Sequence, residues 1–229
     1  MVRRRFLRLG LVRSALVIAG GDPERTLTAL SRLPARPDVV IGVDSGVEVA
    51  VESGIAIDVA VGDFDSLAPS LVERLDTLAS EVVRHPHDKD ASDLELALAW
   101  CRERLPAGSG VMVAGIEGDR PDHHLAAVLL AAAPGLAALS VSVLGSEGQT
   151  WVVHAGAAAE TGGLPAGSTA SVIPVHGDAE VSLAGVRWPL DHHVLTAGTT
   201  LGVSNVVTDP PATVVCHRGT VLLVVPDRV

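Results

Sequence analysis

Aspartate side chains gather in one part of this 229-residue chain, and several of them follow short apolar runs. Eight of the sixteen aspartates lie between Asp44 and Asp93. Carboxylates brought together at one edge of a sheet repel one another unless a cation neutralises them. The pattern therefore favours a site for a hard divalent cation, and Mg²⁺ is the first candidate. The segments concerned are Asp44-Ser45-Gly46, Gly62-Asp63-Phe64-Asp65-Ser66, His87-Asp88-Lys89-Asp90-Ala91-Ser92-Asp93 and Gly118-Asp119-Arg120-Pro121-Asp122-His123.

The single lysine of the chain lies inside one of these segments. The sequence has sixteen arginines and one lysine, Lys89, which stands between Asp88 and Asp90 just ahead of an expected helix. Lysine is a compact point charge that contacts phosphate without a planar fork, and helix N-termini also attract phosphate. We predict that Lys89 contacts a phosphate group, with chance retention of one lysine as the alternative.

Each of these residues also has a purely structural explanation. Asp63 and Asp65 are residue types that turns favour. Ser92 and Glu95 match a capping box, and Asp93 would benefit from the dipole at a helix N-terminus without any ligand. The functional hypothesis therefore depends on the joint occurrence of the segments.

Alternating β-rich and helical patterns must position these side chains. The first 145 residues predict a mostly parallel α/β sheet with helices on both faces, and in such sheets ligands bind outside the carboxyl ends of the strands. Strands are expected over 15–19, 39–43, 59–61, 82–84, 111–114 and 139–144, and helices over 24–33, 47–53, 69–79, 92–105 and 123–133.

The pattern changes after about Gly145, where no helix-length apolar period remains. Strand-like runs separated by Gly, Pro and Asp predict a small all-β sandwich domain. These runs cover 151–154, 168–175, 180–183, 194–197 and 214–225. We expect a basic leader over 1–13, an α/β nucleotide-binding domain over 14–147 and an all-β substrate-binding domain over 148–229.

Charge and cysteine content exclude several classes of function. Seventeen basic against 27 acidic residues give a net charge of −10. Nucleic acid and anionic membranes both reward positive surfaces, so neither is an expected partner. Cys101 and Cys216 have no paired spacing, which argues against a disulfide framework or a zinc site and favours the cytoplasm.

Two segments imitate membrane signals. Residues 123–146 hold no Asp, Glu, Lys or Arg, but Pro134-Gly135 divides the run, so we expect a helix, a turn and a buried strand. The arginine-rich N-terminus precedes an apolar stretch, 15–19, that is shorter than the usual signal-peptide core. We therefore expect no membrane span.

Taken in order, the motifs resemble those of the thiamine pyrophosphokinase (thiamine diphosphokinase) family. Val206 stands where that family often has glutamate. The ordered set is specific although each piece is loose, and it runs from Asp44 to Asn205. The matching pieces are Asp44-Ser45-Gly46, Gly62–Ser66, Lys89-Asp90-Ala91-Ser92-Asp93, Gly118–His123, Gly185-Val186-Arg187-Trp188-Pro189-Leu190 and Gly202-Val203-Ser204-Asn205.

The resemblance implies transfer of the pyrophosphoryl group of ATP to the hydroxyl of thiamine, with release of AMP. It also implies an α/β nucleotide domain, a β-sandwich and a homodimer with sites at the subunit interface. Mg²⁺ would be held by the catalytic residues Asp63, Asp65, Asp93 and Asp122. The nucleotide would contact Asp44, Ser45, Lys89, Asp90, Ser92, Arg120 and His123, and thiamine would contact Trp188, Ser204 and Asn205.

Three alternatives stay open on the sequence alone. A phosphatase of the haloacid dehalogenase type would use Asp63 as a nucleophile, although Leu67 is not the residue type which that family favours there. A related pyrophosphokinase would act on another alcohol, such as a pterin. A catalytically silent regulator would bind thiamine or a nucleotide without turnover. For Trp188, the alternative to a substrate contact is an aromatic residue of the apolar core.

Overall fold

The computed structural model describes residues 13–33 and 35–227, so most of the expected basic leader lies outside the described residues. The chain folds into two compact units. The first contains the described residues up to Val128 together with Leu144–Ser146, and the second contains Leu129–Val143 and the described residues from Glu147 onward. The division that we predicted at residues 147 and 148 stays a prediction.

A five-stranded parallel sheet forms the centre of the first unit. Its order is β5-β1-β2-β3-β4, and every neighbouring pair is parallel. The inner strands are buried along their whole length, as expected for strands covered on both faces. The strands are β1 (Ser14–Ile18), β2 (Val39–Val43), β3 (Val59–Gly62), β4 (Glu81–Arg84) and β5 (Gly110–Ala114).

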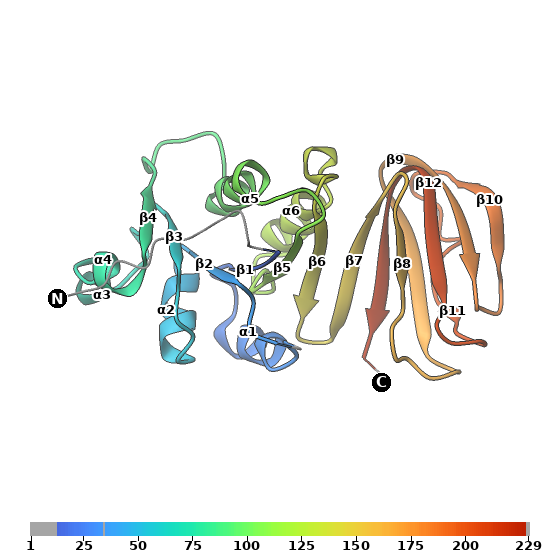
Figure 1. Cartoon of the computed structure of the whole chain (residues 1–229), viewed down its shortest axis with the longest axis horizontal. Coiled ribbons are helices and arrows are strands. Elements are labelled where there is room, and N and C mark those ends of the chain that lie inside the picture. The colour runs from blue at the N-terminus through green and yellow to red at the C-terminus, as the bar shows by residue number, and fades with distance from the viewer. Residues whose placement is uncertain (1–12, 34, 228–229) are drawn as a thin grey trace. The chain divides into compact units, whose positions relative to one another are not determined.

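Helices cover both faces of this sheet, with α1 and α2 on one side and α5 on the other (Figure 1). The apolar side chains of α1 and α2 join those of β1 and β2 in one core cluster. The predicted α/β class is therefore confirmed. The helices are α1 (Pro23–Leu30), α2 (Gly46–Glu52), α3 (Pro69–Val72), α4 (Leu75–Leu78), α5 (Asp93–Arg104) and α6 (Pro121–Ala131).

The helix that we predicted over 69–79 is wrong in one respect, because two short helices replace it. The chain turns at Glu73 and Arg74, between α3 and α4. This turn directs Leu75 into the core, where its side chain is completely buried. Burial of one leucine therefore overrides the continuous helical pattern.

The second unit has an antiparallel β domain in the order β10-β9-β12-β7, with β11 on β9 and β8 on β12. Apolar residues of β7, β9 and β12 enclose a single core. The predicted β domain is confirmed. Its strands are β7 (Gly148–His154), β8 (Ala158–Glu160), β9 (Thr169–Ala184), β10 (Leu190–Leu195), β11 (Asn205–Val206) and β12 (Thr213–Pro226).

One long bent strand, β9, replaces the two strands that we predicted over 168–175 and 180–183. His176 and Gly177 have positive φ, and the pairing of β9 with β12 shifts register around Arg218. Such bulges bend a strand without ending it. The polar and glycine residues that suggested a loop therefore mark a bend.

The charge-free run 123–146 forms the predicted helix, turn and strand. It contains most of α6, a short 3₁₀ helix over Pro134–Leu136 and all of β6 (Ser140–Gly145). None of the helices among the described residues is long and apolar enough to cross a membrane.

Candidate active site

The parallel sheet places five loops at the carboxyl ends of its strands. The chain order changes direction between β1 and β5, which is where α/β sheets open a crevice for ligands. The loops after these two strands are hydrogen-bonded to each other. Gly21 N–H donates to Gly115 O at 2.7 Å, and Asp22 N–H donates to Glu117 O. A Cβ at Gly21 would lie 2.2 Å from the Glu117 oxygen, so this close approach requires glycine.

Gly20 and Gly21 are site-edge residues that our sequence interpretation missed. Their signal was two consecutive glycines directly after a buried strand. A Cβ at Gly20 would lie 1.8 Å from Ser45 Oγ, so this loop also packs closely against the loop after β2. Because these two glycines have no side chains, three neighbouring loops can pack closely at one edge of the sheet.

Lys89 lies between two of the predicted carboxylates. Its Nζ donates to Asp63 Oδ2 at 2.8 Å and to the Pro86 carbonyl at 3.1 Å, and it lies 3.2 Å from Asp93 Oδ1. Its side chain is only 14% exposed. The three N–H groups of the ammonium therefore face three oxygen atoms, so contact with a phosphate requires exchange of one of these partners.

The two carboxylates respond differently to this position. The hydrogen bond from Lys89, helped by that from the Asp65 N–H, lowers the pKa of Asp63 to about 2. Burial raises the pKa of Asp93, and the Asp63 and Asp44 carboxylates add to this increase. The hydrogen bond to Asp63 in turn raises the pKa of Lys89. A second cation near Asp93 would relieve the cost of its buried charge.

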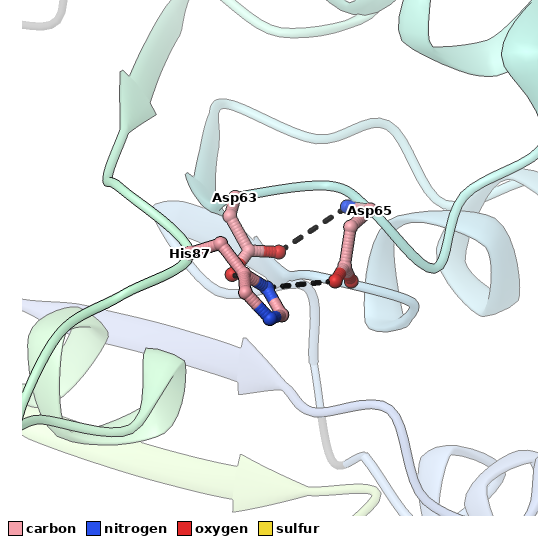
Figure 2. A group of neighbouring side chains, drawn as sticks. All are labelled: Asp63, Asp65 and His87. Carbon is pink, nitrogen blue, oxygen red and sulfur yellow. Dashed lines mark hydrogen bonds and ion pairs between the residues drawn. The ribbon is translucent and has the colours of Figure 1, made fainter.

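Asp65 and His87 lie beside Asp63 at the same edge of the sheet. His87 Nδ1 lies 2.9 Å from Asp65 Oδ2 and 3.4 Å from Asp63 Oδ2 (Figure 2). One donor atom from each of the three residues lies within 4.8 Å of the others, as in a metal site. Our sequence analysis included His87 in one of the polar segments but assigned it no role, because its type and position alone did not show that it faces Asp65.

Asp44 extends the carboxylate cluster from the end of β2. Its backbone has a φ of 48°, and its Oδ2 accepts a hydrogen bond from Ser66 Oγ at 2.7 Å. Asp44 Oδ1 is buried without a hydrogen-bond partner, and so is Asp93 Oδ1 apart from its ion pair with Lys89. Buried carboxylate oxygens of this kind fit a hard divalent cation.

Among the other predicted nucleotide contacts, one side chain caps a helix and two residues are exposed. Ser92 Oγ caps α5 by accepting from the Glu95 N–H at 3.2 Å. Ser45 precedes α2 without a capping hydrogen bond from its side chain, and Asp90 and His123 are exposed. The capping part of the Ser92 interpretation is therefore confirmed, whereas the nucleotide contacts stay predictions.

Arg120 and Asp122 form a pair of their own at the start of α6. Arg120 donates two hydrogen bonds to the Asp122 carboxylate, at 2.9 and 2.7 Å. This pairing lowers the pKa of Asp122. No contact found among residues 13–33 and 35–227 joins Asp122 to Asp63, Asp65 or Asp93. Asp122 is thus the one predicted metal ligand whose two carboxylate oxygens both accept hydrogen bonds from a guanidinium group.

In the β domain, Asn205 fixes the backbone of Trp188. Asn205 Oδ1 accepts from the Trp188 and Val206 N–H groups at 3.2 and 2.9 Å, and its Nδ2 donates to Trp188 O at 2.8 Å. Asn205 is 4% exposed, whereas Trp188 is 56% exposed, with the Arg187 guanidinium 5.2 Å from the centre of its ring. The structural alternative for Trp188, a core aromatic, is wrong.

Ser204 lies on the surface beside this pair. Its φ is 58°, and its N–H donates to Ser171 Oγ at 3.0 Å. Ser204 as a whole is exposed. Of the three predicted substrate contacts, Trp188 and Ser204 are exposed, and Asn205 supports the backbone of Trp188.

We expect the Asn205→Ala variant to lose about 1–3 kcal/mol of unfolding free energy, because two partly buried N–H groups and a partly buried carbonyl would lose their partner. Urea denaturation followed by circular dichroism measures this loss. Ser204→Ala removes only an exposed hydroxyl and should change the same quantity by less than about 0.5 kcal/mol. Equal losses in the two variants would contradict the supporting role of Asn205.

Comparison with known proteins gives the family. Residues 30–139 match the model of the thiamin pyrophosphokinase catalytic domain, and residues 160–221 match that of the thiamin pyrophosphokinase vitamin B1 binding domain. The chain is 27% identical over 219 residues to thiamine pyrophosphokinase of Bacillus subtilis, covering 91% of this chain and 96% of that protein.

Solved structures agree in fold. The crystal structure of thiamine pyrophosphokinase from Bacillus subtilis superposes with a TM-score of 0.78 at 25% identity, covering 94% of this chain and 100% of that one. Thiamin pyrophosphokinase from Candida albicans has the same fold, with a TM-score of 0.73 at 13% identity over 94% and 90% of the two chains. Because the two family models together cover more than half of the chain in the expected order, it belongs to the thiamin pyrophosphokinase family of enzymes.

Proposed function

We propose that this enzyme transfers the pyrophosphoryl group of ATP to the hydroxyl of thiamine, giving thiamine diphosphate and AMP. The observation that carries the proposal is the group formed by Asp63, Asp65, Lys89 and Asp93 at the strand ends of the first unit. Carboxylates and a lysine in one place suit a metal-assisted transfer between phosphates. Membership of the family supplies thiamine as the acceptor.

The carboxylates would hold Mg²⁺, with Asp63, Asp65 and Asp93 as the ligands that geometry supports and Asp122 as the one that resemblance adds. Mg²⁺, when bound, would neutralise the phosphate oxygens on which charge develops. Each oxygen of the Asp122 carboxylate accepts one hydrogen bond from Arg120, which leaves a lone pair on each oxygen for a cation. The guanidinium of Arg120, which has five N–H donors, would offer its remaining ones to a phosphate.

Lys89 would orient the transferred group. Its ammonium faces three oxygen atoms, of which the Pro86 carbonyl, a neutral acceptor, is the easiest to exchange for a phosphate oxygen. We assign the nucleotide to the loops after β1, β2, β4 and β5, which include the proposed contacts of Asp44, Ser45, Asp90 and Ser92, and to the first turn of α6, which carries His123. Positioning of the two substrates would provide most of the rate acceleration.

The β domain would bind thiamine. The exposed ring of Trp188 offers a face for the cationic aromatic substrate, and Asn205 holds the backbone that carries this ring. The hydroxyl of Ser204 lies next in the chain to Asn205 and is exposed. Because Asn205 already uses its amide within the domain, we assign direct contact to Trp188 and Ser204 first.

We further propose a homodimer in the cytoplasm. Several apolar side chains of the β domain are exposed, including Trp188 at 56% and Leu201 at 57%, and a second copy would cover such a surface. Cys101 and Cys216 are buried free thiols, which suits a reducing compartment. Light scattering of the purified protein measures the oligomeric state, and a monomer at micromolar concentration would contradict the dimer.

The activity is tested by incubating the full chain with ATP, Mg²⁺ and thiamine and analysing the products. AMP and thiamine diphosphate are expected. ADP would indicate transfer of a single phosphoryl group, and turnover only with a pterin alcohol would identify another acceptor. Binding of thiamine and ATP without any product would indicate a regulator, and a phosphorylated aspartate would indicate the phosphatase mechanism.

We expect the Trp188→Ala variant to raise the KM for thiamine by about 2- to 30-fold, the range that corresponds to a cation–π contact of about 0.5–2 kcal/mol. The KM for ATP should stay within about twofold. Trp188→Phe keeps an aromatic face and should recover part of the loss. An unchanged thiamine KM in a folded Trp188→Ala protein would remove this ring from the site.

A further inference from the structure

The imidazole of His87 faces the carboxylates from the loop between β4 and α5. Its side chain is 80% exposed, so surrounding packing does not hold the ring in place. Its Nδ1 nevertheless points at Asp65 Oδ2 and Asp63 Oδ2, at 2.9 and 3.4 Å (Figure 2). An exposed histidine–carboxylate pair adds little to stability. Exchange of this contact for a bound cation would therefore cost little.

The spacing of these donor atoms is compatible with a metal site. In an octahedral site with bonds of about 2.1 Å, neighbouring ligand atoms lie about 3 Å apart and opposite ones about 4.2 Å apart. The nitrogen–oxygen distances of 2.9 and 3.4 Å are close to the first of these values.

We propose that His87 Nδ1 is a nitrogen ligand of the divalent cation in this site, beside Asp63 and Asp65. The inference rests on the proposed function only in that the same site holds the cation. Mg²⁺ takes oxygen ligands almost exclusively, whereas imidazole suits later first-row metals. His87 therefore makes this site more favourable to Mn²⁺ and Co²⁺, relative to Mg²⁺, than carboxylates alone would.

Pulsed electron paramagnetic resonance of the Mn²⁺-loaded full chain tests the nitrogen ligand directly. Nitrogen nuclear modulation of the Mn²⁺ echo is expected in the wild type, and it should disappear in His87→Ala and His87→Gln. Glutamine keeps a hydrogen-bond donor for the carboxylates but supplies no imidazole. His85→Ala is the matched control, since His85 lies two residues earlier in the same loop, and this variant should keep the modulation.

Equilibrium binding of the bare metals gives a second measurement. His87→Ala should weaken Co²⁺ binding by about tenfold, the lower end of what disturbing a metal site costs, and Mg²⁺ binding by less than about threefold. Equal losses for the two metals would overturn the inference, since a nitrogen ligand must discriminate between them. Circular dichroism of each variant verifies that the exposed substitution leaves the fold intact.

The outcomes separate this inference from the proposed function. Bound Mn²⁺ without nitrogen modulation, in a protein that converts ATP and thiamine to AMP and thiamine diphosphate, overturns the His87 ligand and leaves the proposed function standing. Nitrogen modulation that depends on His87, in a protein without this turnover, supports the ligand and overturns the proposed function. Absence of Mn²⁺ binding to the wild type overturns the ligand as well.

Discussion

The Asp65→Asn variant should lose about 10³-fold of its turnover with ATP and thiamine, because one developing negative charge would lose its cation-mediated stabilisation. Asparagine keeps the volume and one oxygen of the side chain but removes its charge. Asp65 is 55% exposed and its carboxylate contacts His87, whereas Asp63 holds Lys89. The substitution therefore leaves the Lys89 contacts in place, and the fold should survive.

Steady-state kinetics across a Mg²⁺ titration, with thermal melting beside it, measures this effect. Asp88→Asn is the matched control, because Asp88 is an exposed aspartate in the loop that carries Lys89. It removes the same charge nearby and should change turnover by less than about twofold. A near-normal kcat of Asp65→Asn at limiting Mg²⁺ would remove Asp65 from the metal site.

Much of the fold follows from local sequence pattern. The inner strands β2 and β3 lie within one residue of their predicted ranges, because continuous β-branched runs bounded by glycine and aspartate have one dominant solution. The helix over 69–79 and the two strands that merge into β9 were predicted incorrectly. Both errors arise where a tertiary contact, the burial of Leu75 or the bulged pairing with β12, outweighs local preference.

The candidate site was predictable in its residue types and less so in its contacts. The aspartates were evident because they cluster after strands, and Lys89 because it is the one lysine. The partners of these groups were not evident. His87 turns toward Asp65, and Arg120 toward Asp122, only because loop geometry brings them together. Side-chain pairing across a loop leaves no periodic signal in a sequence, so such contacts require the structure.

Lys89→Ala should lower kcat/KM for ATP by about 10- to 150-fold, which corresponds to the 1.5–3 kcal/mol of a charge-assisted hydrogen bond. The same change should shift the Mg²⁺ dependence to lower concentrations. The reason is that Nζ and a cation compete for Asp63 Oδ2, which Lys89 contacts at 2.8 Å. If Lys89 had a purely structural role, its replacement would lower the stability of the fold. It would not lower kcat/KM for ATP while raising the affinity for Mg²⁺.

Lys89→Arg keeps the charge and should still impair turnover by about tenfold or more, because a planar guanidinium cannot direct its donors at Asp63, Asp93 and the Pro86 carbonyl as one ammonium does. Arg102→Lys is the matched control in the opposite direction. Arg102 pairs with Glu103 on the exposed surface of α5, where both side chains are about half exposed or more, so its exchange should leave turnover and melting temperature unchanged. If Lys89→Arg equals the wild type in both kcat and the KM for ATP, the geometric argument from three converging acceptors fails, and any cation at this position would suffice.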